Sequence, residues 1–276
     1  MKSLFAFLGS VLGAQFISLV LVSNGQAQNY FKPQDLQRFV STLQKKPNFP
    51  TLSTQHPDYV ITQVFLALHY ETQKQPSKVI ELLEPILIQK SYDGKKESYQ
   101  LSVDTLGSFS LWREVMYLTL ARAYYAIGNA SASEYFFKGI PENSSYFESS
   151  RIGLGWALLN QEKNEEAKKT IDLVEARIGS LSRNQRNELI VQKSFWALST
   201  GQVDSAIQLA SSVSTSKEQW VGSIRSKVLA QAYFEKYLAT SDSLSFDEKK
   251  KFLTTVIQYC ESLPSKARDA DLAFFG

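Results

Sequence analysis

The chain has 276 residues, with 30 basic and 27 acidic side chains and a net charge of +3 at neutral pH. This balance argues against a dedicated nucleic-acid-binding protein, which would carry a basic domain or stripe. The single cysteine, Cys260, excludes an intramolecular disulfide framework. The length suits either one extended repeat structure or two compact domains.

Residues 1–27 have the layout of a secretory signal peptide. Lys2 precedes an apolar run over residues 4–22, and small residues stand three and one before a cleavage point after Ala27. We expect removal of this leader, a mature chain that begins at Gln28, and a periplasmic or secreted protein, soluble or peripheral to the membrane. The alternative is an uncleaved anchor, because the run is about long enough to span a bilayer. No cysteine lies near this segment, so lipid attachment there is excluded.

Residues 28–56 form a predicted N-terminal capping segment. A helix is expected over residues 34–44, between Pro33 and Pro47. Its apolar residues recur on one face, with the spacing needed to pack on the structure that follows. They are Leu36, Phe39, Val40 and Leu43.

The remaining chain shows helical periodicity throughout, and no stretch has the sustained alternation of a half-buried strand. Residues 91–108 are expected to be the longest irregular insertion, either an exposed loop with a function or a simple connection. Helices are predicted over residues 57–73, 76–90, 110–127, 130–138, 146–160, 164–178, 183–199, 203–213, 217–237 and 245–262.

A helix-pair motif recurs within these helices. In its clearest copy, the small residue Ala121 lies three residues before the aromatic Tyr124, and Gly128 forms the turn four residues after Tyr124. On the next helix, Ser133 and Phe137 lie four residues apart. In the third copy, Glu162 replaces the turn glycine. The small residues are predicted to let paired helices approach closely. These anchors, at intervals of 54, 34, 39 and 36 residues, are Ala67, Ala121, Gly155, Ser194 and Ala230.

This pattern resembles the tetratricopeptide repeat, whose unit of about 34 residues forms a helix hairpin. The resemblance implies an all-α fold, a right-handed superhelical solenoid of about five hairpins over residues 57–276. The proline that often ends such units is missing at the matching points, so irregular turns are expected. Residues 267–275 read as the start of another helix, which either folds back on the fifth repeat or belongs to a longer protein.

The resemblance also implies a concave groove lined by the first helix of each pair. The lining positions lie three before, one after and four after each small anchor. We expect a protein-binding groove there, with Leu118, Ile152, Leu159, Val191 and Leu198 as its aliphatic positions. The alternative is that a tightly wound superhelix buries these side chains in its core. The candidate binding residues are Arg122, Tyr125, Trp156, Phe195, Lys227, Gln231 and Phe234.

Catalytic and metal-binding motifs are missing from the sequence. It has no zinc-hydrolase, serine-hydrolase or nucleotide-binding pattern. Its two histidines are interpreted as a loop position beside Pro57, at His56, and a solvated or core-edge position in a helix, at His69. No cofactor or metal is expected. Cys260 falls in an apolar helical pattern with Phe252 and Val256, which predicts a buried structural thiol.

These features predict an exported, non-enzymatic scaffold or adaptor in a bacterial envelope assembly. Its partners would be other envelope proteins or peptides, without nucleic acid and without a membrane span once the leader is removed. Two alternatives remain. The chain could be the helical superstructure of a larger envelope enzyme, similar to a soluble lytic transglycosylase. It could also be a helical-repeat protein that captures glycans with exposed aromatic rings.

Overall fold

The computed structural model describes residues 59–92, 97–101, 110–213 and 219–263. The predicted leader, the capping helix over residues 34–44 and the last helix over residues 267–275 lie outside these residues. Within the described ranges, no helix has the length and apolar character needed to cross a membrane.

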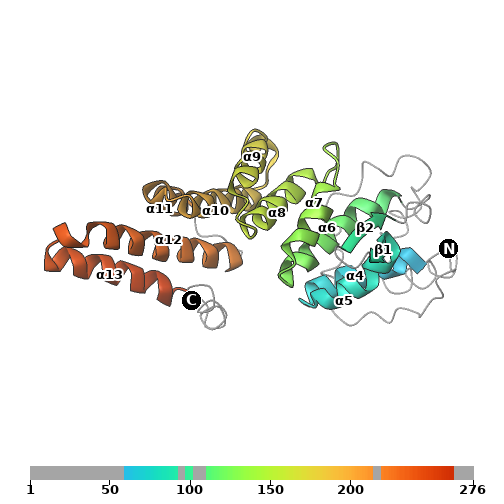
Figure 1. The fold of residues 1–276 in the computed structure, drawn as a ribbon, viewed down its shortest axis with the longest axis horizontal. Helices are drawn as coiled ribbons and strands as arrows, with labels where there is room; N and C mark the ends of the chain where they lie inside the picture. The colour runs from blue at the N-terminus through green and yellow to red at the C-terminus, as the bar shows by residue number, and fades with distance from the viewer. Residues whose placement is uncertain (1–58, 93–96, 102–109, 214–218, 264–276) are drawn as a thin grey trace, which may run out of the picture. The chain divides into compact units, whose positions relative to one another are not determined.

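The described residues form ten α-helices and one β-hairpin (Figure 1). The chain divides into two compact units, residues 1–150 and residues 151–276. Every helix predicted within the described residues is present. The helices are α4 (Tyr59–Thr72), α5 (Pro76–Leu87), α6 (Ser110–Ala126), α7 (Ala130–Lys138), α8 (Phe147–Leu159), α9 (Asn164–Glu175), α10 (Arg183–Ser199), α11 (Val203–Ser212), α12 (Gln219–Thr240) and α13 (Phe246–Glu261).

Four helix pairs share one turn geometry, in which a single residue takes a positive φ. These residues are Lys74, Gly128, Glu162 and Gly201. In each turn the next backbone N–H donates to the carbonyl five residues earlier, at 2.8 to 3.0 Å, which closes the end of the first helix. Lys74 and Glu162 take the left-handed conformation where the other two turns have glycine, each at a cost of about 1 to 2 kcal/mol. The repeat register read from the sequence is therefore confirmed at the backbone level.

Polar caps fix the starts of several helices. At α13, Ser245 accepts a hydrogen bond from the Glu248 backbone N–H, and Glu248 accepts bonds from both the hydroxyl and the backbone N–H of Ser245. The hydrogen bond from the Ser245 hydroxyl, together with that from its backbone, holds the pKa of Glu248 below its usual value. A similar reciprocal pair, Ser182 and Gln185, begins α10.

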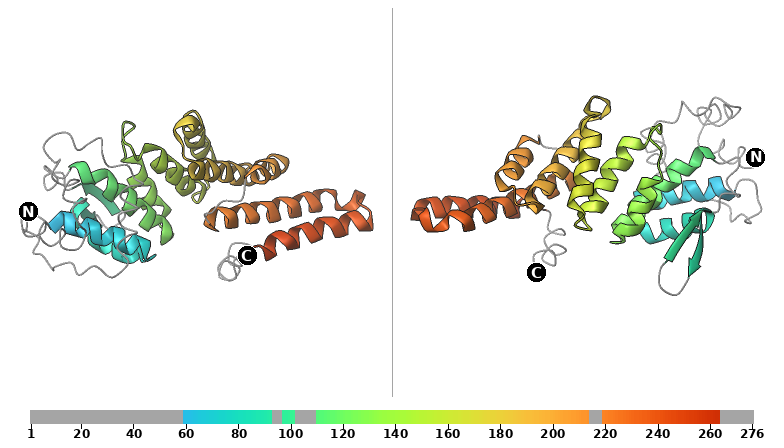
Figure 2. Two further views of the ribbon diagram at one scale, coloured as in Figure 1. Left: turned by 180° about the vertical axis from the view of Figure 1, so that it is seen from behind. Right: turned by 45° about the horizontal axis from the view of Figure 1, so that its top comes forward.

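A β-hairpin replaces part of the expected irregular insertion. Strand β1 (Ile88–Tyr92) pairs antiparallel with β2 (Glu97–Leu101), so that Ile88 faces Leu101 (Figure 2). The prediction of helix to residue 90 and of an irregular loop after it was wrong. Asp93-Gly94 between the two strands is a turn signal that also marks hairpins. Periodicity missed the strands because each has only five residues.

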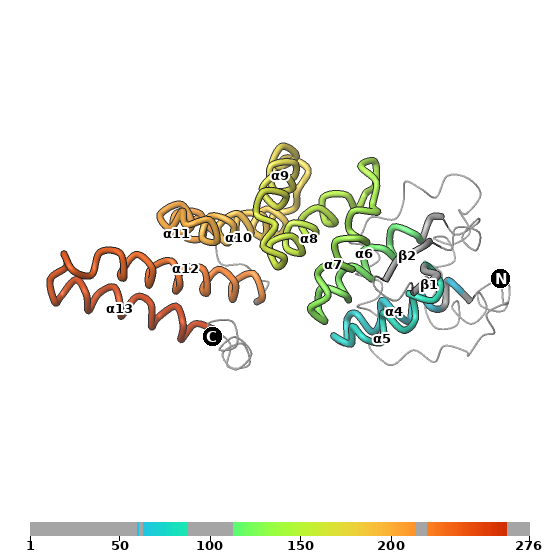
Figure 3. Tube along the Cα trace, in the orientation of Figure 1, coloured from blue at the N-terminus to red at the C-terminus, as the bar shows by residue number. Residues whose placement is uncertain are grey.

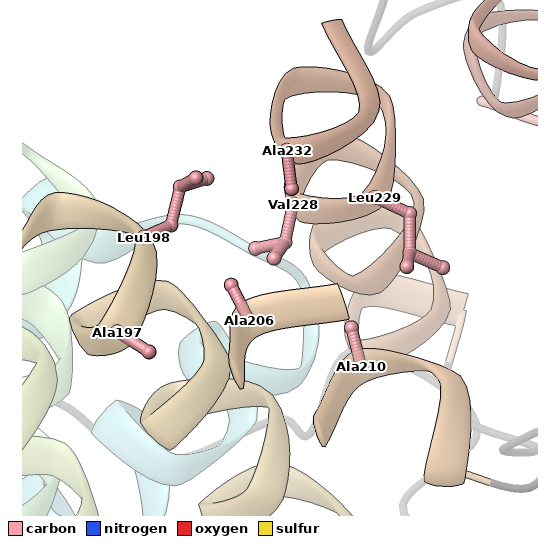
Figure 4. Close-up of a cluster of buried hydrophobic side chains, with 7 residues drawn as sticks. All are labelled: Ala197, Leu198, Ala206, Ala210, Val228, Leu229 and Ala232. Atoms are coloured by element: carbon pink, nitrogen blue, oxygen red, sulfur yellow. The ribbon is translucent and has the colours of Figure 1, made fainter. Parts of the chain in front are cut away.

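The small anchors lie in the core of the hairpins, as predicted. Ala67, Ala121, Gly155, Ser194 and Ala230 are all buried. Where α11 meets α12, two further small residues, Ala206 and Ala210, lie in one buried cluster with Val228, Leu229 and Ala232 (Figure 4). Small side chains on one helix face allow the larger ones on the neighbouring helix to pack closely.

Together, the helix pairs, the shared turns and the buried anchors confirm the predicted all-α class of tetratricopeptide-like hairpins, with the β-hairpin as an addition. In the second unit α10 and α11 form one hairpin, and α12 and α13 form the next (Figure 3). The packing of α11 on α12 joins these two hairpins into a stack.

Candidate partner-binding face

The predicted groove positions divide into buried and exposed groups. The aliphatic positions Leu118, Ile152, Leu159, Val191 and Leu198 are all buried. The predicted aromatic and polar positions range from buried on α8 to exposed on α12. The predicted groove positions are therefore open only in part: those on α12 reach solvent, whereas the aliphatic positions and those on α8 pack in the core.

Trp156 on α8 belongs to the core. Its side chain is only 7% exposed, its indole N–H donates to Glu188 Oε1 at 3.3 Å, and its ring meets Phe195 edge to face with centroids 5.9 Å apart. Phe195 is half-buried beside it. The expectation of an open aromatic at Trp156 was wrong, because α10 packs against this face of α8 and covers the indole.

The contact between α8 and α10 leaves no room beside Gly155. A Cβ atom built on Gly155 would lie 2.6 Å from Gln192 Nε2. Gln192 is fully buried, and its Nε2 donates to the Ile152 carbonyl at 2.8 Å. The helices can approach this closely only because residue 155 has no side chain, so its predicted role as a close-approach anchor is confirmed.

The first unit presents Arg122 and Tyr125 on α6, and both are half-buried. Arg122 forms an ion pair with Glu71 of α4, with Nη1 and Oε1 3.4 Å apart. This pair is partly exposed, and such pairs contribute at most about 1 kcal/mol to stability. Arg122 is thus held by its neighbour and still reaches solvent.

Near Arg122, the connection between α7 and α8 holds a buried phenol. Tyr146 is buried, and its hydroxyl has no hydrogen-bond partner among the described residues. Burial raises the pKa of Tyr146 to about 12; the nearby Glu114 carboxylate adds to the rise and the Arg122 guanidinium opposes it. Ser144 ties Glu114 to this connection through a hydrogen bond of 2.6 Å.

Helix α12 carries the part of the predicted face that remains open. Phe234 is 43% exposed, with its ring stacked on that of Tyr237, while Lys227 and Gln231 are half-buried. Gln231 donates to Glu235 along the same helix at 2.9 Å. All three predicted residues of this copy reach solvent on α12.

Two further exposed residues extend this face, and sequence reasoning did not select them. Leu238 is 57% exposed and lies four residues after Phe234, while Trp220 is 43% exposed and lies seven before Lys227. Spacings of four and seven place them on one helical stripe with the predicted residues. Continuing the helical period past the anchor-based positions would have found them.

Helix α13 differs from the other second helices of the pairs because it has no buried residue. Phe252 and Tyr259 face α12, where both rings contact Tyr233. Cys260 is exposed, so the predicted buried thiol was wrong. The reason is geometric: Cys260 follows Tyr259, and successive helical residues point about 100° apart.

Candidate metal ligands and the histidine of α4 were located in the described part of the chain. No group of three or more histidine, cysteine, aspartate or glutamate side chains could hold a metal ion there. His69 is a buried residue of α4, and its ring lies against that of Tyr70 with centroids 5.8 Å apart.

Comparison with known proteins yields only distant similarities. No protein-family model matches the chain, and no curated protein matches it. A crystal structure of a Podosopora anserina putative kinesin light chain with nearly identical TPR-like repeats is 20% identical, with a TM-score of 0.46, over 75% of this chain and 97% of that chain. A variant of that protein is 19% identical, with a TM-score of 0.43, over 80% and 97%. Because both scores are low, the fold assignment rests on the hairpins themselves.

Proposed function

We propose that this protein is an exported, non-enzymatic scaffold that binds another protein of a bacterial envelope assembly through the face of α12. The support comes from the exposed stripe on that helix, where Trp220, Phe234 and Leu238 offer apolar surface next to the polar positions Lys227 and Gln231. Stacked helical repeats generally use extended surfaces to bind other proteins.

The chemistry of the α12 face favours an apolar helix or extended peptide as the ligand. Aromatic side chains give a large contact area and often dominate binding energy at protein interfaces. Lys227 lies between Trp220 and Phe234 in the sequence and adds a basic group to the stripe. We therefore expect the bound segment to present apolar side chains to the aromatic residues of the stripe.

Affinity capture from envelope extracts, followed by mass spectrometry, tests this proposal. The parent protein is compared with Phe234→Asp combined with Leu238→Asp, which places two charges on the stripe. Partners that bind the stripe should be lost from the variant, while its helical circular dichroism stays close to that of the parent. A matched control is Leu173→Asp, at an exposed apolar position of α9. Equal recovery of every partner by all three proteins would refute the proposed face.

Export is proposed from Lys2, the apolar run and Ala27, all in the predicted leader. Intact-mass measurement on protein from the envelope fraction should show a chain that starts at Gln28. A chain that keeps Met1 and stays with the membrane would refute leader removal and favour an anchor.

A further inference from the structure

Helices α12 and α13 form one hairpin, and the contacts between them fix which way each helix faces. The ring of Tyr233 on α12 contacts the rings of Phe252 and Tyr259 on α13. Farther along the pair, the hydroxyl of Ser262 donates a hydrogen bond to the hydroxyl of Ser226 at 2.9 Å. These residues mark the inner sides of the two helices.

The residues that follow these contacts turn toward one common side of the hairpin. Each helical residue points about 100° away from the residue before it. Because α12 and α13 run antiparallel, one step along each chain from the shared contact turns both helices toward the same side. Phe234 follows Tyr233 on α12. Leu253 follows Phe252 on α13 in the same way, so the side chains of residues 234 and 253 lie on one side of the hairpin.

Helix α11 packs on the opposite side. Ala232, which precedes Tyr233, lies in the buried cluster with Ala206 and Ala210 of α11 (Figure 4). The side with Phe234 therefore faces away from α11, and we call it the open face of the hairpin. Its exposed apolar residues follow each helix in steps of four and seven. They are Phe234, Leu238, Phe246, Leu253 and Ile257.

Apolar surface and positive charge are concentrated on the open face. Its five residues are half of the ten large apolar residues that are exposed in the described part of the chain, and such a concentration marks an interaction site. Lys249 and Lys250 stand between Phe246 and Leu253 in the sequence. Their helical positions lie on either side of the line that joins those two apolar residues. Among the described residues, neither lysine side chain has an ion-pair partner.

The charge of the open face decides between possible occupants. A second copy that used the same face would bring the lysines of both chains into one contact, and like charges at an interface are unfavourable. The acidic residues of α13 do not offset these lysines on the face, because Asp247 and Glu248 point about 100° and 200° away from Phe246 around the helix. A partner that carries carboxylates beside an apolar stripe satisfies both features of the face.

The architecture of the open face favours a helix over an extended peptide. Both elements that form the face are α-helices, whose backbone groups pair within each helix, so the face offers no sheet edge to an extended segment. A bound α-helix satisfies its own backbone. It can lay an apolar stripe against the ridges of residues four apart on each helix.

We propose that the open face binds an amphipathic helix of another protein. The apolar stripe of that helix lies on Phe234 and Leu253, and its acidic residues lie toward Lys249 and Lys250. This inference rests on the proposed function, because it names the kind of element that the α12 face binds and extends the binding surface to α13.

Two synthetic helical peptides of about 20 residues test the proposal. Both carry leucines at every third and fourth position, and the residues beside that stripe are glutamate in one peptide and lysine in the other. The glutamate peptide should bind the parent protein about fivefold more tightly at low salt, because it forms two exposed ion pairs of modest strength. This preference should shrink at high salt. Isothermal titration calorimetry measures the dissociation constants.

Three variants separate the contributions of charge and apolar contact. Lys249→Gln combined with Lys250→Gln should bind the two peptides equally, and Leu253→Asp should weaken binding of both. Lys251→Gln is the matched control, because it removes a charge of the same lysine run about 140° away from Phe246 around the helix, and it should keep the preference. Circular dichroism checks that every variant is folded. A parent protein that binds both peptides equally, or binds neither, would overturn the proposal.

Cys260 reports whether the bound helix reaches α13. It follows Tyr259, so it lies on the open face, and it is an exposed thiol and the only cysteine of the chain. The glutamate peptide at nine-tenths occupancy should slow the reaction of this thiol with a maleimide about tenfold. Binding without protection of Cys260 would overturn the extension to α13 and would leave the proposed function of α12 standing.

Measurements on the protein without peptide identify the other possible occupants. Self-association in analytical ultracentrifugation that Leu253→Asp abolishes would assign the open face to a second copy. Binding to phosphatidylglycerol vesicles that Leu253→Asp abolishes would assign it to a membrane surface. Either result would overturn the proposal. The proposed function is judged separately, since capture of envelope proteins that depends on Phe234 and Leu238 does not require a preference between the two peptides.

Discussion

Helices α8 and α12 are each the first helix of a repeat pair, but side chains at equivalent positions are buried on α8 and reach solvent on α12. On α8, Trp156 lies under α10 and is held there by Glu188 and Phe195. Leu159 of α8 is buried as well. On α12, Gln231 corresponds to Trp156 and Phe234 corresponds to Leu159, and both reach solvent.

The difference teaches that a repeat position is core or surface according to its neighbours. The first helix of the following pair covers the face of α8, whereas the described residues place no such helix on the face of α12. Stacked repeats contact mainly their neighbours, so a face that no described neighbour covers is available for a partner. Substituting one buried residue of α8 and one exposed residue of α12 tests this comparison directly.

The largest expected effect belongs to Trp156→Ala. Removing a buried indole leaves a cavity and should lower the free energy of unfolding by roughly 3 to 5 kcal/mol. Combining it with Phe195→Ala should lower stability further. Urea denaturation followed by circular dichroism measures both effects. A stability equal to that of the parent would show that α10 does not cover this face of α8.

A smaller loss is expected for Gly155→Ala, which places a methyl group against buried Gln192. Overpacking of this kind typically costs about 1 to 3 kcal/mol. The control is Gly222→Ala in α12, where a Cβ meets nothing within 4 Å and helix propensity predicts a gain of roughly 0.5 to 1 kcal/mol. Thermal melts compare the two variants with the parent. Equal shifts for both would refute the close approach of α8 and α10.

Alkaline titration extends the comparison to the first unit. The pKa of Tyr146 is raised from 10.0 to about 12 in the folded chain, so its stabilising effect is complete below pH 10 and is lost as pH rises toward 12. At pH 11 this loss amounts to about 1 kcal/mol. Tyr146→Phe should lack it and keep its neutral-pH stability, because the hydroxyl has no hydrogen-bond partner among the described residues.

Denaturation curves at pH 8 and pH 11 measure this difference. Exposed Tyr135→Phe serves as the control and should follow the parent at both values. An equal loss of unfolding free energy between pH 8 and pH 11 in Tyr146→Phe and the parent would show that ionisation of Tyr146 does not cause the loss.

The smallest effect is expected for Phe234→Ala, a change at an exposed ring of the α12 face. Its ring is 43% exposed, so truncation should change the free energy of unfolding by only about 0.5 kcal/mol or less. The same urea denaturation experiment measures it. A loss as large as that of Trp156→Ala would place Phe234 in a core and remove the basis for the α12 face.

The sequence by itself determined the helices, the pairing of helices into hairpins and the small anchors. Apolar periodicity marks the helices, and turn residues mark their ends. Even Glu162, where the motif lacks glycine, takes the left-handed turn that the other copies use. These features depend on neighbours within a few residues, which a sequence motif records directly.

Only the tertiary structure decided which predicted groove residues are open. Trp156 and Phe234 carry similar local signals, and the covering helix that separates them comes from another repeat. Cys260 was mispredicted for the same reason: it belongs to an apolar helical pattern, but α12 packs on the adjacent face of α13. The β-hairpin was missed because its two strands depend on pairing with each other, on either side of Asp93-Gly94 in the sequence. Burial is a property of contacts between distant segments, and a local pattern cannot say which of two apolar faces its neighbour will cover.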